Sequence, residues 1–342
     1  MHYPERMVRY RWKLLRAGEF RLDGGSMFGL IPRPVWSRSA KPDEQGRIDV
    51  QHNCLLLERL DDPPPPVHGK PALPSPKLVL LEVGTGDKLD PASKRLFELS
   101  ERTVLTALHE ADCRPEDVGG VVVSHLHFDH AGALTRLARS GERPDWTGPV
   151  SSMVGARGEH GVVRSFPNAR IHAQACEWAD ARENKSVMTR TYFADHLEPI
   201  ATQIELADSP RPYAPGIAPG RTQMPIGSVS QRRTEIMPGV FVFLVPGHTW
   251  GQQATMFVDD RGRTIVFTPD VMPTVNHVGA TYSLAYDVEP YTSMLSRRWF
   301  LDEAAAGDWL LVLDHEPGHP CVRVRTNGKG WFDLVPDDAG RA

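Results

Sequence analysis

Short apolar runs alternate along the chain with stretches in which apolar residues recur at helical spacing. Runs typical of buried strands occur at residues 53–59, 77–83, 118–123, 168–172, 240–245, 254–258, 264–267 and 309–313. Helical patterns occur at residues 91–111, 131–140, 175–184 and 301–307, and a further helix is expected to end near residue 205. Because both halves of the chain contain both patterns, we predict a layered α/β or α+β domain.

Proline changes this picture only locally. Of the 30 prolines, beside 29 glycines, 12 gather in two clusters at residues 63–76 and 210–225, and such runs favour extended backbone outside helices and sheets. The first cluster separates two apolar runs, which predicts a hairpin with a long tip. We therefore expect one domain over residues 1–342, with an N-terminal extension over about 1–50. Loop insertions are expected at about 61–76, at the irregular stretch 143–167, and at 207–235.

Charge and cysteine content narrow the class of protein. Lys and Arg number 39 against 43 Asp and Glu, a net charge of −4, which argues against a binder of the nucleic-acid backbone. No apolar run approaches the 18 residues of a membrane helix, and the first residues lack an apolar secretory region. The four cysteines form no C-x-x-C pair, as expected of reduced thiols. We expect a cytoplasmic protein with a small-molecule substrate, no nucleic-acid or membrane partner, and a homodimer as an open alternative to a monomer.

The strongest chemical signal is the segment Ser124-His125-Leu126-His127-Phe128-Asp129-His130, directly after an apolar run. Loops at the carboxyl ends of strands are where α/β folds tend to hold their sites. Three imidazoles and one carboxylate within six residues supply nitrogen and oxygen ligands suited to Zn, Fe or Mn. In an extended segment, alternation places the first two imidazoles on one side.

Further ligand residues follow other apolar runs. Residues 241–245 lead into Pro246-Gly247-His248-Thr249, residues 264–267 lead toward Asp270, and residues 309–313 lead into Asp314-His315-Glu316. A repeated order of strand, turn and ligand would place these side chains at one rim of the sheets.

These motifs together resemble the metallo-β-lactamase superfamily. The likeness rests on H-x-H-x-D-H at 125–130, G-H-T at 247–249, Asp270 after a strand, His315, and the turn Gly84-Thr85-Gly86. It covers roughly residues 50–320 and implies an α+β fold, a four-layer αβ/βα sandwich with a dinuclear metal site at one edge. The implied ligands are His125, His127 and His248 for one ion, Asp129, His130 and His315 for the other, and Asp270 as a bridge.

Within the superfamily the chain is similar to the lactonase and organophosphate-hydrolase branch, through residues 23–32 and the segment Asp270-x-x-Pro-Thr-x-x-His277. It departs from that pattern in two places. Glu82 stands where the family's D-T-G segment has an aspartate. Pro273 stands where the similar lactonases have a tyrosine that polarises the substrate carbonyl. His277, Tyr282 and Tyr286 are candidates to replace it.

The resemblance implies a hydrolase that uses a hydroxide bridging two divalent metal ions, zinc first, with manganese, iron or cobalt accepted by the same ligands. The substrate would be a small ester, lactone or phosphotriester. Asp129 and Asp270 are the expected catalytic residues, and Phe28 and His277 the candidate substrate contacts. The alternatives are a thioesterase of the glyoxalase II kind and a non-catalytic signalling module that keeps the metal site.

Overall fold

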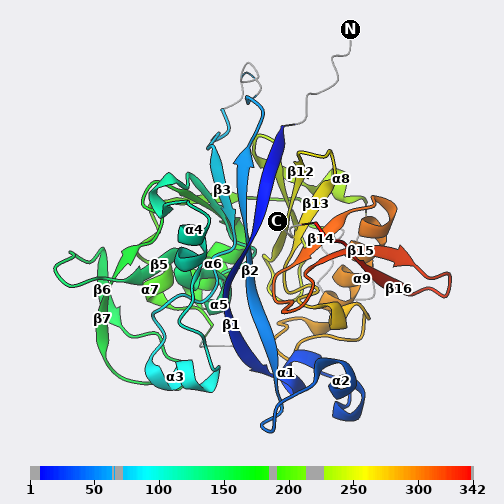
Figure 1. Ribbon diagram of the computed structural model, residues 1–342, viewed down its shortest axis with the longest axis horizontal. Helices are drawn as coiled ribbons and strands as arrows, with labels where there is room; N and C mark the ends of the chain where they lie inside the picture. Colours follow the sequence, from blue (N-terminus) through cyan, green and yellow to red (C-terminus); the bar gives the residue numbers. More distant parts are fainter. Residues whose placement is uncertain (1–7, 64, 66–71, 185–190, 213–226, 340–342) are drawn as a thin grey trace.

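The computed structural model describes residues 8–63, 65, 72–184, 191–212 and 227–339. At its centre lies a long antiparallel strand pair, β1 (Arg9–Asp23) and β2 (Arg47–Arg59), which crosses the molecule (Figure 1). The register of the pair shifts between Arg16 and Glu19. Gly18 lies at this shift with φ +126°, and a Cβ there would come within 2.5 Å of the Arg102 carbonyl oxygen. Glycine is thus required where the strand bends.

The other strands extend the sheet in two directions from this pair. One half adds, beyond β2, the strands β3 (Leu78–Leu81), β4 (Gly120–Val122), β8 (Arg170–Gln174) and β9 (Ile204–Ala207). The other half joins β1 through β12 (Gln253–Asp259), β13 (Thr264–Thr268), β14 (Leu310–Leu313), β15 (Cys321–Thr326) and β16 (Phe332–Pro336), with β11 (Val240–Leu244) and β10 (Thr234–Met237) also on β12's side. The predicted hairpin β2–β3 is confirmed, and β12 and β13 form a second antiparallel pair.

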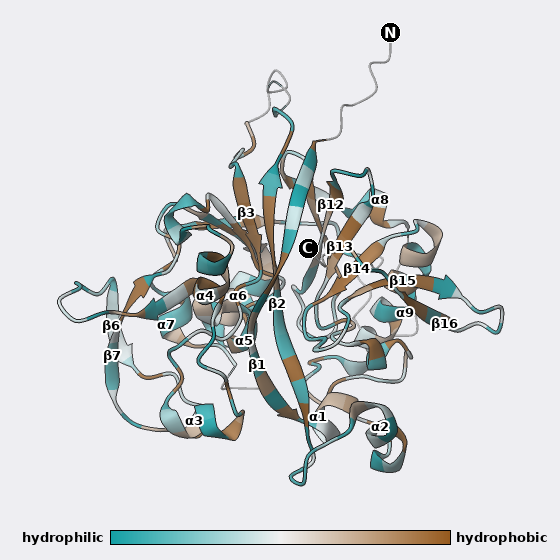
Figure 2. Cartoon of the chain, viewed as in Figure 1, coloured by the Kyte–Doolittle hydropathy of each residue, from teal (hydrophilic) through white to brown (hydrophobic). Residues whose placement is uncertain are grey.

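Three apolar clusters define the layers. One lies between the two halves of the sheet and joins residues such as Leu57 and Val79 to Phe257 and Ile265. The outer face of the first half is covered by α4 (Val104–Glu110) and α6 (Ala175–Glu183), and the outer face of the second half by α9 (Pro290–Ala306). Figure 2 shows the hydrophobic character of β3, β13 and β14. The order helix, sheet, sheet, helix confirms the expected α+β sandwich.

The remaining helices are short. They are α1 (Gly24–Phe28), α2 (Arg33–Ala40), α3 (Pro91–Leu96), η1 (Pro115–Asp117), α5 (Phe128–Ala131), η2 (Gly132–Leu134), α7 (Ala194–Leu197), α8 (Val229–Arg232) and η3 (Val275–His277). In the described part of the chain, no helix has both the length and the apolar content needed to cross a membrane.

Several elements differ from the sequence prediction. The helix predicted at 131–140 is wrong: η2 leads instead into β5 (Thr135–Leu137). Residues 135–137 pair instead with residues 162–164, and the turn before them is held by the buried Lys88 Nζ, which donates to the Gly132 carbonyl and to the Thr135 carbonyl at 2.7 Å. Residues 143–167 are not irregular throughout, because β6 (Trp146–Pro149) and β7 (Glu159–Arg164) complete a small sheet with β5.

Other helices and strands also have bounds that differ from the sequence prediction. Residues 91–111 form α3 and α4 rather than one helix, with Glu98 between them at φ +44°. The segment near residue 205 belongs to β9, not to a helix end. The helix predicted at 301–307 is the last part of the longer α9. Of the predicted insertions, residues 64, 66–71 and 213–226 lie outside the described residues.

Candidate metal centre

The ligand residues predicted from sequence come together at one edge of the sheet halves. The loop after β4 carries His125 to His130, and the turns after β11, β13 and β14 carry His248, Asp270 and His315. Strands β13 and β14 are parallel, so their carboxyl ends share an edge. The repeated order of strand, turn and ligand residue therefore places these side chains at one rim of the sheets, as the sequence pattern indicated.

Three buried histidines form the first group, His125, His127 and His248. The Nδ1 atom of His127 lies 3.0 Å from Nε2 of His248. The Nε2 atom of His125 is buried and has no hydrogen-bond partner. Three ring nitrogens that converge within 4.8 Å of one another, one of them without a partner, suit a cation that accepts their lone pairs.

The second group is richer in oxygen. His130 Nε2 and His315 Nε2 lie 3.2 Å apart, and carboxylate oxygens of Asp129 lie 3.8 Å and 3.7 Å from these two nitrogens. Asp270 stands between the groups: its Oδ2 is 3.0 Å from His248 Nε2 and 3.6 Å from His130 Nε2. One oxygen of the Asp270 carboxylate, Oδ1, has no hydrogen-bond partner. The geometry brings all seven predicted residues together.

Asp314 joins this second group, although the sequence reasoning did not include it among the ligands. Both of its carboxylate oxygens are buried without hydrogen-bond partners, and Oδ2 lies 3.9 Å from His130 Nδ1. Burial and the nearby Asp270 raise the pKa of Asp314 well above its usual range. The signal available in the sequence was a carboxylate at a strand end, immediately before the last histidine.

Glu82 reaches the same histidine despite its additional methylene. Its Oε1 accepts a 2.6 Å hydrogen bond from the Ser124 backbone N–H, and its Oε2 lies 3.6 Å from His130 Nδ1. Its backbone adopts φ +63°, which is uncommon for a residue with a side chain. Glu82 thus lies against the first ligand loop, where the family's aspartate was expected to act.

Hydrogen bonds on the far ring nitrogens orient three of the histidines. Asp287 Oδ1 lies 3.0 Å from His248 Nδ1, the Gln51 carbonyl oxygen 3.0 Å from His315 Nδ1, and Ser124 Oγ 3.0 Å from His125 Nδ1. Such partners fix the ring orientation and the tautomer of a metal-binding histidine. Asp287 and Gln51 are separated in sequence from the ligand motifs, which is why sequence reasoning missed them.

The three histidines of the first group differ in the direction in which their pKa values are shifted. Burial lowers the pKa of His125 and of His127 well below the usual range, so both rings are neutral. Burial also opposes protonation of His248, but the carboxylates of Asp270 and Asp287 outweigh it and raise its pKa to about 10. In the metal-free protein this ring holds a proton, which a metal ion must displace to bind there.

A cavity of about 120 Å³ opens onto these ligands. Among the described residues, its walls are largely apolar and include no Lys or Arg. The lining residues are Leu22, Met27, Phe97, His127, Phe128, Asp129, Met153, Thr191, His248, Asp270, Leu284, Tyr286 and His315.

The two predicted substrate contacts lie behind this cavity. Phe28 is fully buried and stacks on Trp36 and on His277. His277 is also fully buried, with Nε2 2.8 Å from the Met27 carbonyl oxygen. Neither lines the cavity, and their shared neighbour Met27 does.

Of the residues considered as replacements for the lactonase tyrosine, only Tyr286 lines the cavity. Tyr282 packs edge-on against Phe28. Pro273 itself serves the backbone, because its carbonyl accepts a 3.1 Å bond from the His315 N–H.

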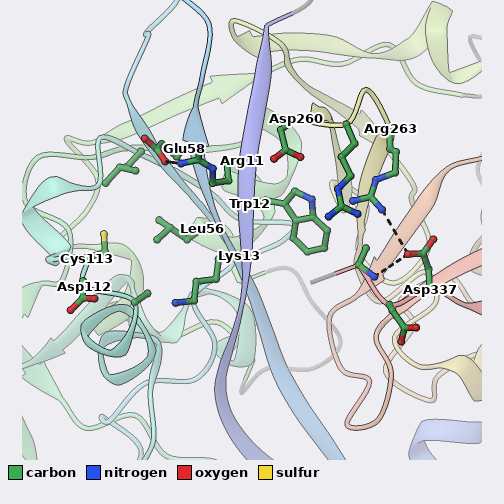
Figure 3. Close-up of a pocket in the computed structure, with 15 residues that line it drawn as sticks. Arg11, Trp12, Lys13, Leu56, Glu58, Asp112, Cys113, Asp260, Arg263 and Asp337 are labelled. Carbon is green, nitrogen blue, oxygen red and sulfur yellow. Dashed lines mark hydrogen bonds and ion pairs between the residues drawn. The ribbon is translucent and has the colours of Figure 1, made fainter. Parts of the chain in front are cut away.

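A larger cavity, of about 760 Å³, surrounds Trp12 and contains none of the predicted site residues (Figure 3). It lies toward the other end of β1: Trp12 and Leu22, which lines the smaller cavity, are about 30 Å apart along the strand. Size alone therefore does not locate the chemistry of this protein.

Comparisons with known proteins agree with this geometry. A probable metal-dependent hydrolase from Staphylococcus aureus has a similar structure, with TM-score 0.69 and 19% identity over 98% of this chain and 99% of that one. The dizinc quorum-quenching lactonase AidC matches with a TM-score of 0.62 and 16% identity, over 97% of this chain and 98% of that one. The hydrolase AbOPH matches with a TM-score of 0.63 and 17% identity, over 98% of this chain and 96% of that one.

At these identities the likeness concerns the fold, and on that level the resemblance to the lactonase and organophosphate-hydrolase branch is confirmed. A search of curated proteins gives no match. The family model described as "Metallo-beta-lactamase superfamily" matches residues 78–315, more than half of the sequence. This chain therefore belongs to the metallo-β-lactamase superfamily.

Proposed function

We propose that this protein is a dinuclear metal-dependent hydrolase of a small, neutral ester, lactone or phosphotriester. The observation that carries the proposal is the Asp270 group, by which we mean His125, His127, Asp129, His130, His248, Asp270 and His315. Its ring nitrogens and carboxylate oxygens face one another at the floor of a cavity, and some have no other partner. When bound there, two divalent ions would supply Lewis acidity and lower the pKa of water.

The chain's own residues then divide the work. Asp129 lines the cavity beside His315, where its carboxylate can orient an attacking water and accept the proton of that water. Tyr286 lines the same cavity, and burial raises its pKa to about 12, so its hydroxyl keeps its proton near neutral pH. We assign to this hydroxyl the hydrogen bond to the substrate oxygen that becomes negative.

The cavity walls support the substrate class. Leu22, Met27, Phe97, Phe128 and Leu284 offer apolar contact, and no Lys or Arg among the described lining residues could pair with an anionic group. A neutral acyl or aryl substituent suits such walls. The glyoxalase II-like alternative has less support, because no Lys or Arg among the described lining residues could pair with the carboxylates of a glutathione thioester.

The direct test is hydrolysis of a panel of lactones, aryl esters and phosphotriesters by the metal-loaded protein. We expect turnover of at least one class, loss of it with a chelator, and loss of it in His127→Ala. Tyr286→Phe should lower kcat by about 10²-fold with a smaller change in metal content. Full activity in His127→Ala would refute the proposal. Bound metal with no turnover of any class would favour the non-catalytic module.

A further inference from the structure

Glu177 is a fully buried carboxylate that belongs to neither ligand group. It lies in the first turn of α6 and is 1% exposed. A buried carboxylate is costly unless hydrogen bonds compensate it. The places where those hydrogen bonds go identify what this residue does.

One carboxylate oxygen holds the first ligand loop. Glu177 Oε1 accepts a 2.9 Å hydrogen bond from the Leu126 backbone N–H. Leu126 stands between the ligands His125 and His127, and its own side chain is buried in the outer core of the first sheet half. The bond therefore fixes the backbone from which both histidines project.

The other oxygen holds the loop from the opposite half of the sheet. Glu177 Oε2 accepts a 2.6 Å hydrogen bond from Thr249 Oγ1, and Thr249 directly follows the ligand His248. Two residues later, a Cβ on Gly251 would come within 2.5 Å of the Glu177 backbone nitrogen. This loop thus lies directly against the first turn of α6, where only glycine fits.

Tyr192 adds a third connection. Its hydroxyl donates to Glu177 Oε1 at 3.2 Å, and its ring lies 5.2 Å from the His127 ring between centroids. One carboxylate thereby receives hydrogen bonds from the backbone beside His127, from the residue that packs on His127, and from the residue after His248. Among the described residues, its hydrogen bonds do not extend to His130 or His315.

We infer that Glu177 is a positioning residue. It joins the loop that carries His125 and His127 to the loop that carries His248, and so sets the separation of His127 from His248; these three histidines are the three-histidine group. The inference rests on the proposed function, because it assigns that separation to metal binding. It makes an asymmetric prediction: loss of Glu177 weakens metal binding at the three-histidine group much more than at the group formed by His130, His315 and Asp129.

The test uses Co²⁺ as the probe, added to chelator-treated full-length protein and followed by its visible absorption and by competition with a chelator. We expect Glu177→Ala to lower the affinity of one site by about 10- to 100-fold, the effect typical of residues that orient ligands. Its residual spectrum should match that of His248→Ala and not that of His315→Ala. Glu177→Gln should recover most of the affinity, because its amide oxygen still accepts and the Thr249 hydroxyl can accept from its amide N–H.

Asp259→Ala is the matched control for general destabilisation. Asp259 is also a fully buried carboxylate with hydrogen bonds to backbone N–H groups, but it lies at the end of β12. It should lose stability without a change in either Co²⁺ site. Unchanged affinities in Glu177→Ala, or equal losses at both sites, would overturn the inference while wild-type hydrolysis leaves the proposed function standing. A wild-type protein that binds no Co²⁺ would overturn both.

Discussion

The Asp270 group and the polar cluster formed by Lys88, Ser151, His160, Asp195 and His196 are both buried, and both combine histidine with carboxylate. They differ in how their atoms are paired. Asp195 accepts from Ser151 Oγ at 2.6 Å and lies 2.9 Å from His160 Nε2, and of this cluster's buried side-chain atoms only His196 Nδ1 has no hydrogen-bond partner. In the Asp270 group, ring nitrogens instead face other ring nitrogens.

This difference separates a structural cluster from a site. Nearly complete pairing stabilises the fold and leaves little affinity for a ligand. Converging nitrogen and oxygen atoms without hydrogen-bond partners cost stability, and they are retained where they bind a ligand. We therefore expect substitutions in the Asp270 group to remove activity with little effect on folding, and substitutions in the Asp195 cluster to do the reverse.

The largest expected effect is in Asp270→Asn. Loss of the shared carboxylate should lower kcat/KM by about 10³-fold or more. The free energy of unfolding of the chelator-treated protein should fall by no more than about 1 kcal/mol, because His248, once it loses its carboxylate partner, can give up its proton and accept a hydrogen bond from the Asn amide. Steady-state kinetics and urea unfolding on one preparation measure both. A large fall in stability would erase the contrast between the clusters.

The next effect tests whether the contrast extends to the partner of a ligand. Asp287→Asn should lower metal affinity by about 10- to 100-fold, because His248 loses the carboxylate that orients its ring. Competition with a fluorescent chelator measures this. Metal affinity equal to wild type would confine the site to the Asp270 group alone.

A stability effect is expected from Lys88→Met. The Gly132 and Thr135 carbonyls would lose their buried ammonium donor, at a cost of about 1–3 kcal/mol in the free energy of unfolding. Urea unfolding measures it, and kcat of the folded enzyme should change by less than about 3-fold, within the error of such structural effects. A loss of activity as large as that in Asp270→Asn would show that this cluster also serves the chemistry.

The smallest effect concerns acid stability. Burial alone would raise the pKa of Asp195, but His196, His160 and Lys88 outweigh it and hold that pKa below its usual value of 3.8. A depressed carboxyl pKa contributes stability that is present above about pH 4 and lost as the pH falls below it. Asp195→Asn should be less stable near neutral pH and show a flatter fall in stability below pH 4. Parallel acid limbs for the two proteins would contradict this account of the cluster.

The sequence was enough to predict that the residues of the Asp270 group lie together, because their segments follow recognisable apolar strands. The segment 125–130, His248, Asp270 and His315 each mark a strand end, so local patterns sufficed to place them at one edge. Residues that act across long sequence distances had no such pattern. Glu177 is 51 residues from Leu126 and 72 from Thr249, and Lys88 is 47 from Thr135.

The same physical limit explains the errors in the fold. The helix predicted at 131–140 has a reasonable local pattern, but residues 135–137 pair with residues 162–164, and Lys88 holds the turn before them. Strand β1 is a different case, because its local pattern is present in the sequence: residues 9–14 alternate charged and apolar side chains, which is typical of a half-buried strand. Tertiary contacts decide segments such as 131–140, where the local pattern is ambiguous.

The most direct test of the central claim is the metal content of protein purified without chelator, compared with that of His127→Ala and Asp270→Asn. The account predicts about two divalent ions per wild-type chain, from the number of ions that such shared-carboxylate sites hold, and a clear fall in both variants. Near-zero metal in the wild type, or an equal metal content in all three proteins, would contradict it.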